Sequence, residues 1–262
     1  MQKKSFFNRY NTAVTGLFSG CSLQELIART RTSAAEGADG IAIELHALPP
    51  EERTVDNFKA IMNEAMLPFM FICYRSCQWY GKDDAGRQEF LLRAAEAGAE
   101  VIDVMGDLYA PAADELTRDR DAVARQQELM AEIRQRGAKV LISSHMTSLP
   151  PKSAEEIVNL LSIQAERGAD ICKIVTNGDT EEAFLEAIRA DIMLSRNFPK
   201  PFIHLTSGKY SKMHRFMGTK LGLAMTFGVP DYNMTGYSQP LIRSFKQVRD
   251  IIPWDIADIL AE

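Results

Sequence analysis

The stretch EGADGIAIEL, residues 36–45, contains the pattern that decides the fold of this chain. It joins a Gly-Ala pair and one polar residue to an apolar run rich in isoleucine. The same phrase returns as AGAEVIDVMG at 97–106, RGAKVLISSH at 136–145 and RGADICKIVT at 167–176. Each phrase follows an amphipathic helical pattern, and its glycine suits the left-handed residue that ends a helix. The phrase therefore marks the junction between a helix and the following strand.

The spacing of these junctions predicts repeated helix-plus-strand units. The gap between the first two motifs is long enough for one further unit, and its strand is LPFMFICYR at 67–75. Strands are expected at 12–18, 40–48, 69–75, 100–106, 139–145, 170–176, 202–207 and 222–228. Helices are expected at 22–36, 83–97, 121–136, 153–167 and 180–195. Eight strands alternating with helices imply parallel pairing and a closed barrel. We predict an α/β fold, a (β/α)8 TIM barrel forming a single domain over 1–262; a doubly wound open sheet is the alternative.

Length and composition agree with an ordinary globular enzyme. The chain has 262 residues, close to the roughly 250 of a typical barrel, with 46% hydrophobic and 25% charged residues. The net charge of −5 comes without basic stretches, so we expect no nucleic-acid partner. No apolar run reaches the ~20 residues of a membrane helix, and the N-terminus lacks the apolar region of a signal peptide. The four cysteines form no CxxC pair, so we expect reduced thiols and a soluble, cytoplasmic protein.

Lys173 is the most unusual residue of the predicted strands. It lies in Ile-Cys-Lys-Ile-Val, residues 171–175, a run that should be buried. A buried ammonium is costly unless it is paired, and burial favours the neutral amine. Either a nearby group pairs with this charge, or the site requires an uncharged amine. We therefore favour a functional role for Lys173 over a structural one.

Other polar residues fall at or after strand ends, where barrels of this kind carry their chemistry. Glu44 and His46 are two residues apart and should share one face of the second strand. The remaining candidates are Arg75, His145, Arg215 and Gln239. A structural role is open for each of them alone, but the constellation is more informative than any single member.

A metal site is an alternative interpretation of the histidines. Glu44, His46, His145 and His204 could together bind a metal, as in sugar-isomerising barrels. The chain has neither an HxH nor an HExxH motif, and this alternative leaves Lys173 unexplained. We therefore predict no metal and no organic cofactor.

These residues resemble the type I 3-dehydroquinate dehydratases, Schiff-base-forming (β/α)8 barrels of the shikimate route to aromatic amino acids and of quinate use. Lys173 in GADICKIV matches the Schiff-base lysine and is the most specific match. His145 in SSHM and Glu44 in GIAIELHAL match the family's histidine and glutamate. Arg75, Arg215 and Gln239 match an arginine after strand three, an arginine after strand seven and a glutamine in the last loop.

The chain departs from the family pattern at five positions. His46 replaces an arginine that contacts substrate, and Trp79 replaces a glutamate. Met105 replaces an acid near the histidine at the end of strand four, and Met146 replaces an aspartate. Thr235 replaces a serine of the last loop. The lysine and histidine are kept while part of the substrate-binding shell is altered.

The resemblance implies a hydro-lyase that removes water from a cyclic β-hydroxyketone carboxylate. His145 would move protons, and Glu44 would orient His145 or a substrate hydroxyl. Arg215 and Arg75 would bind the carboxylate, with Gln239, His46 and Thr235 completing the substrate site. A homodimer is expected from the resemblance alone. The alternatives are another Schiff-base lyase or aldolase on a different hydroxyketo acid, and a non-catalytic relative that binds a carboxylated ligand.

Overall fold

A single sheet of eight parallel strands forms the centre of the computed structural model, which describes residues 5–7, 11–75, 84–231 and 239–260. The strand order is β7-β6-β5-β4-β3-β2-β1-β8. The strands are β1 (Ala13–Ser19), β2 (Gly40–Glu44), β3 (Phe69–Ile72), β4 (Val101–Met105), β5 (Lys139–His145), β6 (Ile171–Asn177), β7 (Phe202–Ser207) and β8 (Met225–Gly228). Ala224, just before β8, donates its N–H to the carbonyl of Phe202 in β7 at 2.8 Å. The sheet is therefore a nearly closed barrel, and the predicted (β/α)8 fold is confirmed.

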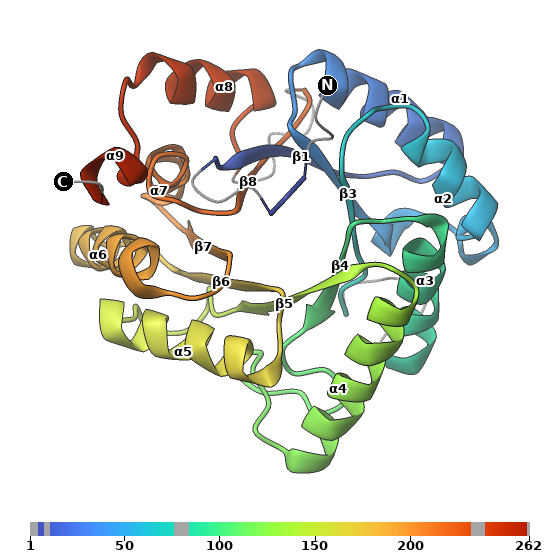
Figure 1. Cartoon of the computed structure of the whole chain (residues 1–262), viewed down its shortest axis with the longest axis horizontal. Coiled ribbons are helices and arrows are strands. Elements are labelled where there is room, and N and C mark those ends of the chain that lie inside the picture. Colours follow the sequence, from blue (N-terminus) through green and yellow to red (C-terminus); the bar gives the residue numbers. More distant parts are fainter. Residues whose placement is uncertain (1–4, 8–10, 76–83, 232–238, 261–262) are drawn as a thin grey trace.

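Helices surround the barrel on its outer side (Figure 1). They are α1 (Leu23–Ala35), α2 (Val55–Met62), α3 (Asp84–Ala97), α4 (Arg120–Gln135), α5 (Ala154–Arg167), α6 (Glu181–Asn197), α7 (Ser211–Gly218), α8 (Ile242–Ile251) and α9 (Ile256–Leu260). The five helices expected from periodicity all form, with ends within two residues of the expectation. Among the residues that the structure describes, no helix combines the length and apolarity needed to span a membrane.

The recurring Gly-Ala motif has two structural roles. Its glycines have left-handed φ values, at Gly37 (90°), Gly98 (107°), Gly137 (91°) and Gly168 (105°), and so end their helices. The polar residue of the motif can then bond to the neighbouring strand and helix. Asp170 Oδ2 accepts the backbone N–H of Val140 at 2.9 Å and binds Arg134 Nε at 3.1 Å. This carboxylate joins the start of β6 to the start of β5 and to α4.

Some strands are shorter than expected. β2 ends at Glu44 and is followed by a 3-10 turn, Leu45–Ala47, closed by the Leu48 N–H on the carbonyl of Leu45. The expectation that Glu44 and His46 share one strand face was therefore wrong. The prolines at 49 and 50 cannot donate to a sheet, which favours an early end of the strand. β8 likewise begins only at Met225, because Gly222 has a left-handed φ of 82° that belongs to a turn.

Candidate active site

A cavity of about 330 Å³ lies at the C-terminal ends of the strands. This volume is within the range of small-molecule sites. Five of the residues predicted from the sequence line it together: Glu44, His145, Lys173, Arg215 and Gln239. They come from β2, β5, β6, α7 and the segment before α8, so the barrel brings together side chains that are far apart in the sequence.

Lys173 lies in β6 with only 5% of its surface exposed. Its Nζ is 3.5 Å from His145 Nε2 and 3.6 Å from Asp103 Oδ2, and it faces the Phe227 ring at 5.4 Å from the ring centre. The amine is thus buried and points into the cavity, as the sequence predicts. Its surroundings differ from the expected purely apolar ones because a carboxylate from β4 stands beside it.

Asp103 begins a short buried chain of polar groups inside the barrel. Ser143 in β5 donates to Asp103 Oδ1, and Tyr74 Oη is 2.5 Å from Ser143 Oγ. Asp103 Oδ2 has no hydrogen-bond partner among the described residues and faces Lys173. Burial raises the pKa of Asp103, and the charge of Lys173 only partly offsets this. This carboxylate is therefore a better proton acceptor than an ordinary aspartate.

His145 ends β5 and is held by a glutamate from the loop after β4. Its Nδ1 is 3.1 Å from Glu115 Oε2, and its backbone N–H donates to the same oxygen at 2.8 Å. The Tyr74 ring meets the imidazole edge to face at 4.8 Å. Burial would raise the pKa of Glu115, but its hydrogen bonds from His145 lower it below the ordinary value. Glu115 is thus ionised at neutral pH and leaves Nε2 of His145 facing the lysine.

Local backbone features place Glu115 at this position. Its φ of 49° is left-handed, an uncommon conformation for a residue with a side chain. The loop passes so close to Gly106 that an added Cβ there would lie 2.5 Å from the carbonyl oxygen of Glu115. Ser144 donates to that same oxygen at 2.7 Å. Gly106 and Ser144 together hold the loop against β5.

Arg215 provides an incompletely paired cation in the cavity wall. It is 4% exposed, and only its Nη2 has a hydrogen bond, a long one of 3.4 Å to the carbonyl of Thr206. Its Nε and Nη1 have no partner among the described residues, and neither does Oε1 of Gln239. Burial lowers the pKa of Arg215 to about 10, still well above neutrality. A buried guanidinium with free donors is suited to an anion such as a carboxylate.

Arg75 and His46 do not line the cavity together with these residues. Nη1 of Arg75 donates to both carboxylate oxygens of Asp107, at 2.9 and 2.8 Å, and its Nη2 donates to the Asp107 carbonyl. His46 leaves the barrel in the 3-10 turn, with Nδ1 3.5 Å from Glu44 Oε2. Thr235, like Ser76 and Trp79, lies outside the described residues.

The metal site considered from the sequence is not assembled. His204 points outward from β7 and bonds to Asp191, whereas His145 bonds to Glu115 inside the barrel. Alternate residues of a strand face opposite sides, and Leu205 rather than His204 faces the cavity. Among the described residues, the one group of metal-type ligands is a different one, outside the barrel.

The family model for type I 3-dehydroquinase matches residues 18–254. The chain belongs to the type I 3-dehydroquinase family. The 3-dehydroquinate dehydratase of Klebsiella pneumoniae is 25% identical over 95% of this chain and 97% of that protein. That of Alkaliphilus oremlandii is 32% identical over 114 residues, and the catabolic enzyme of Acinetobacter baylyi is 29% identical over 115 residues. The matches to these two relatives span only about two fifths of their length, 43% and 41%.

Solved structures show the same fold. The 3-dehydroquinate dehydratase of Geobacillus kaustophilus superposes with a TM-score of 0.76 at 16% identity, covering 92% of this chain and 91% of that one. The Enterococcus faecalis protein gives a TM-score of 0.72 at 17% identity, with coverages of 92% and 94%. The family resemblance inferred from the sequence motifs is confirmed.

Sequence reasoning missed three residues of the site: Tyr74, Asp103 and Glu115. Asp103 has the same signal as Lys173, a charged residue inside an apolar strand, and that signal could have revealed it. Tyr74 directly precedes Arg75, but an aromatic residue after a strand is ordinary. Glu115 has no local signal, because its position depends on a left-handed turn in a loop. The family has an acid near the histidine at the position of Met105. In this chain Glu115 provides the acid beside His145 instead.

Proposed function

We propose that the chain dehydrates 3-dehydroquinate through an imine formed on Lys173. The observation that carries this proposal is the position of the lysine amine. It is buried in the cavity, 3.5 Å from His145 Nε2, in a member of the type I 3-dehydroquinase family. A buried amine beside an imidazole has the two groups that imine formation and proton transfer require.

The lysine must lose its proton before it can attack. Asp103 Oδ2 at 3.6 Å and His145 Nε2 at 3.5 Å are the nearby acceptors. The raised pKa of Asp103 favours transfer to this carboxylate. The nitrogen lone pair of Lys173 then adds to the ketone carbon. The carbonyl oxygen leaves as water after taking one proton from the nitrogen and one from the group that accepted the lysine proton. The product is an iminium linked to Lys173.

His145 carries the next proton transfers. The iminium withdraws electrons and acidifies the neighbouring C–H, whose proton passes to Nε2 of His145. The electron pair of that bond expels the β-hydroxyl group, which takes the proton from His145 and leaves as water. Hydrolysis of the imine returns the amine. Glu115 on Nδ1 stabilises the imidazolium between these steps.

The carboxylate of the substrate would be bound by Arg215 and Gln239. Both line the cavity and both have hydrogen-bonding atoms without a partner. Glu44 in β2, which also lines the cavity, would accept hydrogen bonds from ring hydroxyls. The proposal assigns no role to Arg75, because Asp107 already occupies its guanidinium. The cytoplasmic location and the homodimer stay predictions.

The test combines turnover with trapping of the imine. Pure protein incubated with 3-dehydroquinate should produce the ultraviolet absorbance of a conjugated enone. Borohydride added during turnover should inactivate the enzyme and add the mass of the reduced substrate to the peptide containing Lys173. Lys173→Met serves as the matched control and should show neither signal. Turnover without any adduct on Lys173 would exclude the imine mechanism.

A second candidate is an imine-forming lyase for a different hydroxyketo acid. The observation that favours it is the altered substrate shell, with His46 outside the cavity and Arg75 paired to Asp107. The same experiment separates the two candidates. A borohydride adduct with another hydroxyketo acid, without turnover of 3-dehydroquinate, would support the second candidate. Ligand binding without any adduct would support a non-catalytic protein.

A further inference from the structure

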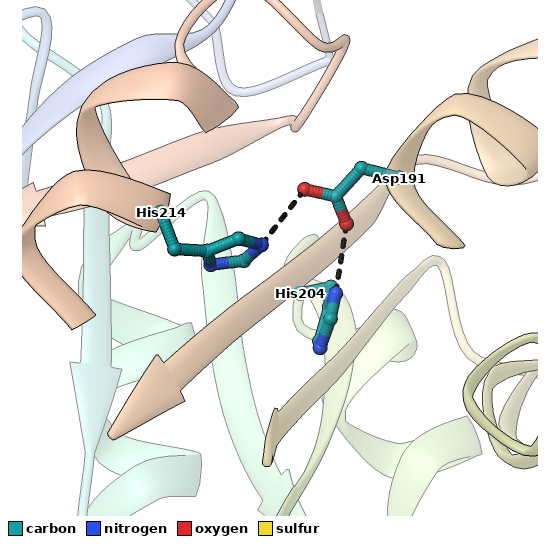
Figure 2. Close-up of side chains that lie close together, drawn as sticks. All are labelled: Asp191, His204 and His214. Atoms are coloured by element: carbon teal, nitrogen blue, oxygen red, sulfur yellow. Dashed lines mark hydrogen bonds and ion pairs between the residues drawn. The ribbon is translucent and has the colours of Figure 1, made fainter. Parts of the chain in front are cut away.

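A second cluster of titratable side chains lies outside the barrel and takes no part in the proposed chemistry. It consists of Asp191 from α6, His204 from β7 and His214 from α7, and all three are fully buried. Figure 2 shows the two imidazoles converging on the carboxylate from different elements. The cluster thus connects two helices to the outer face of the strand between them.

The contacts within the cluster are close but incomplete. His204 Nδ1 is 2.8 Å from Asp191 Oδ1, a hydrogen bond that would have to be given up if the same nitrogen bound a metal. His214 Nε2 is 3.1 Å from Asp191 Oδ2, yet among the described residues neither atom has a properly directed hydrogen bond, and His214 Nδ1 has none either. Buried polar atoms are nearly always satisfied, and each exception calls for an explanation such as strain, a catalytic role, or a bound water or ion. The unsatisfied pair therefore needs an explanation.

A metal ion explains this geometry. Two ligands of a tetrahedral zinc ion, each ~2.0–2.2 Å from it, lie roughly 3.2–3.5 Å apart, which is close to the 3.1 Å between His214 Nε2 and Asp191 Oδ2. The 2.8 Å between His204 Nδ1 and Asp191 Oδ1 is shorter than this spacing, so binding would require the His204 ring to turn from Oδ1 toward the ion. One atom from each residue lies within 4.8 Å of the others. Two imidazole nitrogens and one carboxylate oxygen form a ligand set typical of zinc.

The surroundings of His204 support the same conclusion. With Nδ1 turned to the cluster, Nε2 lies 3.0 Å from Thr176 Oγ1 in β6. A metal-bound histidine usually has its second nitrogen held by such a polar partner, which orients the ring.

We propose that Asp191, His204 and His214 bind one divalent transition-metal ion of the zinc class, with Thr176 orienting His204. The fourth position would hold water, as three protein ligands leave one site of a tetrahedral ion open. The ion would lock α6 and α7 onto β7, as a structural rather than a catalytic centre. This proposal is independent of the proposed function, since none of the three ligands lines the catalytic cavity.

The test is metal stoichiometry and spectroscopy on the full-length protein. Because the cluster is sealed from solvent, the chain is unfolded in urea with a chelator and refolded with Zn²⁺ or Co²⁺ before excess ion is removed. We expect about one ion per chain by elemental analysis, and visible Co²⁺ absorption of tetrahedral strength. Refolding without metal should give a lower melting temperature, which added Zn²⁺ during refolding restores.

Variants assign the ion to this cluster. Asp191→Asn and His214→Asn should each abolish binding, and Thr176→Val should weaken it by about 10- to 100-fold, the usual effect of losing an outer partner. His46→Asn is the matched control, since this histidine also stands beside a carboxylate but outside the cluster, and it should bind as wild type does. Refolded wild-type protein that retains neither ion would overturn the proposal, whatever the folding of the variants. Binding that survives in Asp191→Asn and His214→Asn, or is lost only in His46→Asn, would do so as well.

Discussion

The two ends of the barrel differ in how completely their charged side chains are paired. At the N-terminal end of the strands, Asp39 accepts the N–H of Val14 and pairs with Lys246 at 3.0 Å and Arg249 at 2.8 Å. Asp170 is bound in the same manner by Val140 and Arg134. These charges are fully used in joining strands to helices.

At the C-terminal end, several buried polar atoms have no hydrogen-bond partner among the residues that the structure describes. They are two nitrogens of Arg215, Oε1 of Gln239 and Oδ2 of Asp103, which has only its ion pair with Lys173. Unsatisfied buried groups are destabilising, and a protein retains them where a ligand completes them. The charges at the N-terminal end are thus paired between elements of the fold, whereas the cavity keeps donors and acceptors that a ligand could pair.

Lys173→Met should give the largest effect of a single change. Loss of the nucleophile should lower kcat for 3-dehydroquinate by ~10⁴-fold or more. The melting temperature should fall only modestly, because Met fills a similar volume and Asp103, left without the lysine, can take up a proton. Steady-state kinetics and thermal unfolding measure both. Lys246→Met at the opposite end is the control, with a lower melting temperature and normal activity per folded molecule. A Lys173 variant that retains activity would contradict the role of Lys173 as the nucleophile.

Arg215→Met should weaken binding of a carboxylate ligand by about 10²- to 10³-fold, since it removes a buried charged partner. The free protein should become more stable. Folding lowers the pKa of Arg215 to about 10, so a penalty of roughly 3 kcal/mol is present at neutral pH and is relieved only as the pH rises through 10. Chemical unfolding at pH 7.5 with and without ligand measures both effects. A variant destabilised at neutral pH yet binding ligand normally would contradict the comparison.

Glu115→Gln should lower kcat by about 10- to 100-fold, because His145 loses the charge that stabilises its protonated form. KM should change little, since Glu115 does not line the cavity. Asp114→Asn is the matched control, as its neighbouring carboxylate pairs with Arg118 on the surface. The split between kcat and KM, and the pH profile of kcat, separate a role at His145 from general disturbance of the loop. Equal effects of the two variants would remove Glu115 from the mechanism.

Asp170→Asn should have the smallest functional effect. The change weakens the link among β5, β6 and α4, which should lower the free energy of unfolding by about 1–3 kcal/mol. Activity per folded molecule should stay that of wild type, because the residue lies at the opposite end of β6 from the cavity. Urea unfolding and titration of active sites measure the two quantities. Reduced kcat in fully folded protein would show that the two ends are coupled.

Much of the fold could be predicted because its signals are local. Helix periodicity, the left-handed glycines and the apolar runs lie within windows of ten to fifteen residues. Strand length was less predictable at β2, where the 3-10 turn removed His46 from the expected face. Lys173 and His145 could be predicted as a pair because the C-terminal ends of barrel strands meet in one place.

The sequence alone determined the eight-fold repeat of helix and strand, the placement of Lys173 in a buried strand and the set of strand-end residues around it. Only the tertiary structure determined which charged side chains pair with one another. It joined Glu115 to His145, Asp103 to Lys173 and Asp107 to Arg75, and turned His204 outward to Asp191 and His214. Periodicity gives the face of an element on which a side chain lies. The partner it meets there depends on loops and neighbouring elements distant in sequence, and only the folded chain brings these together.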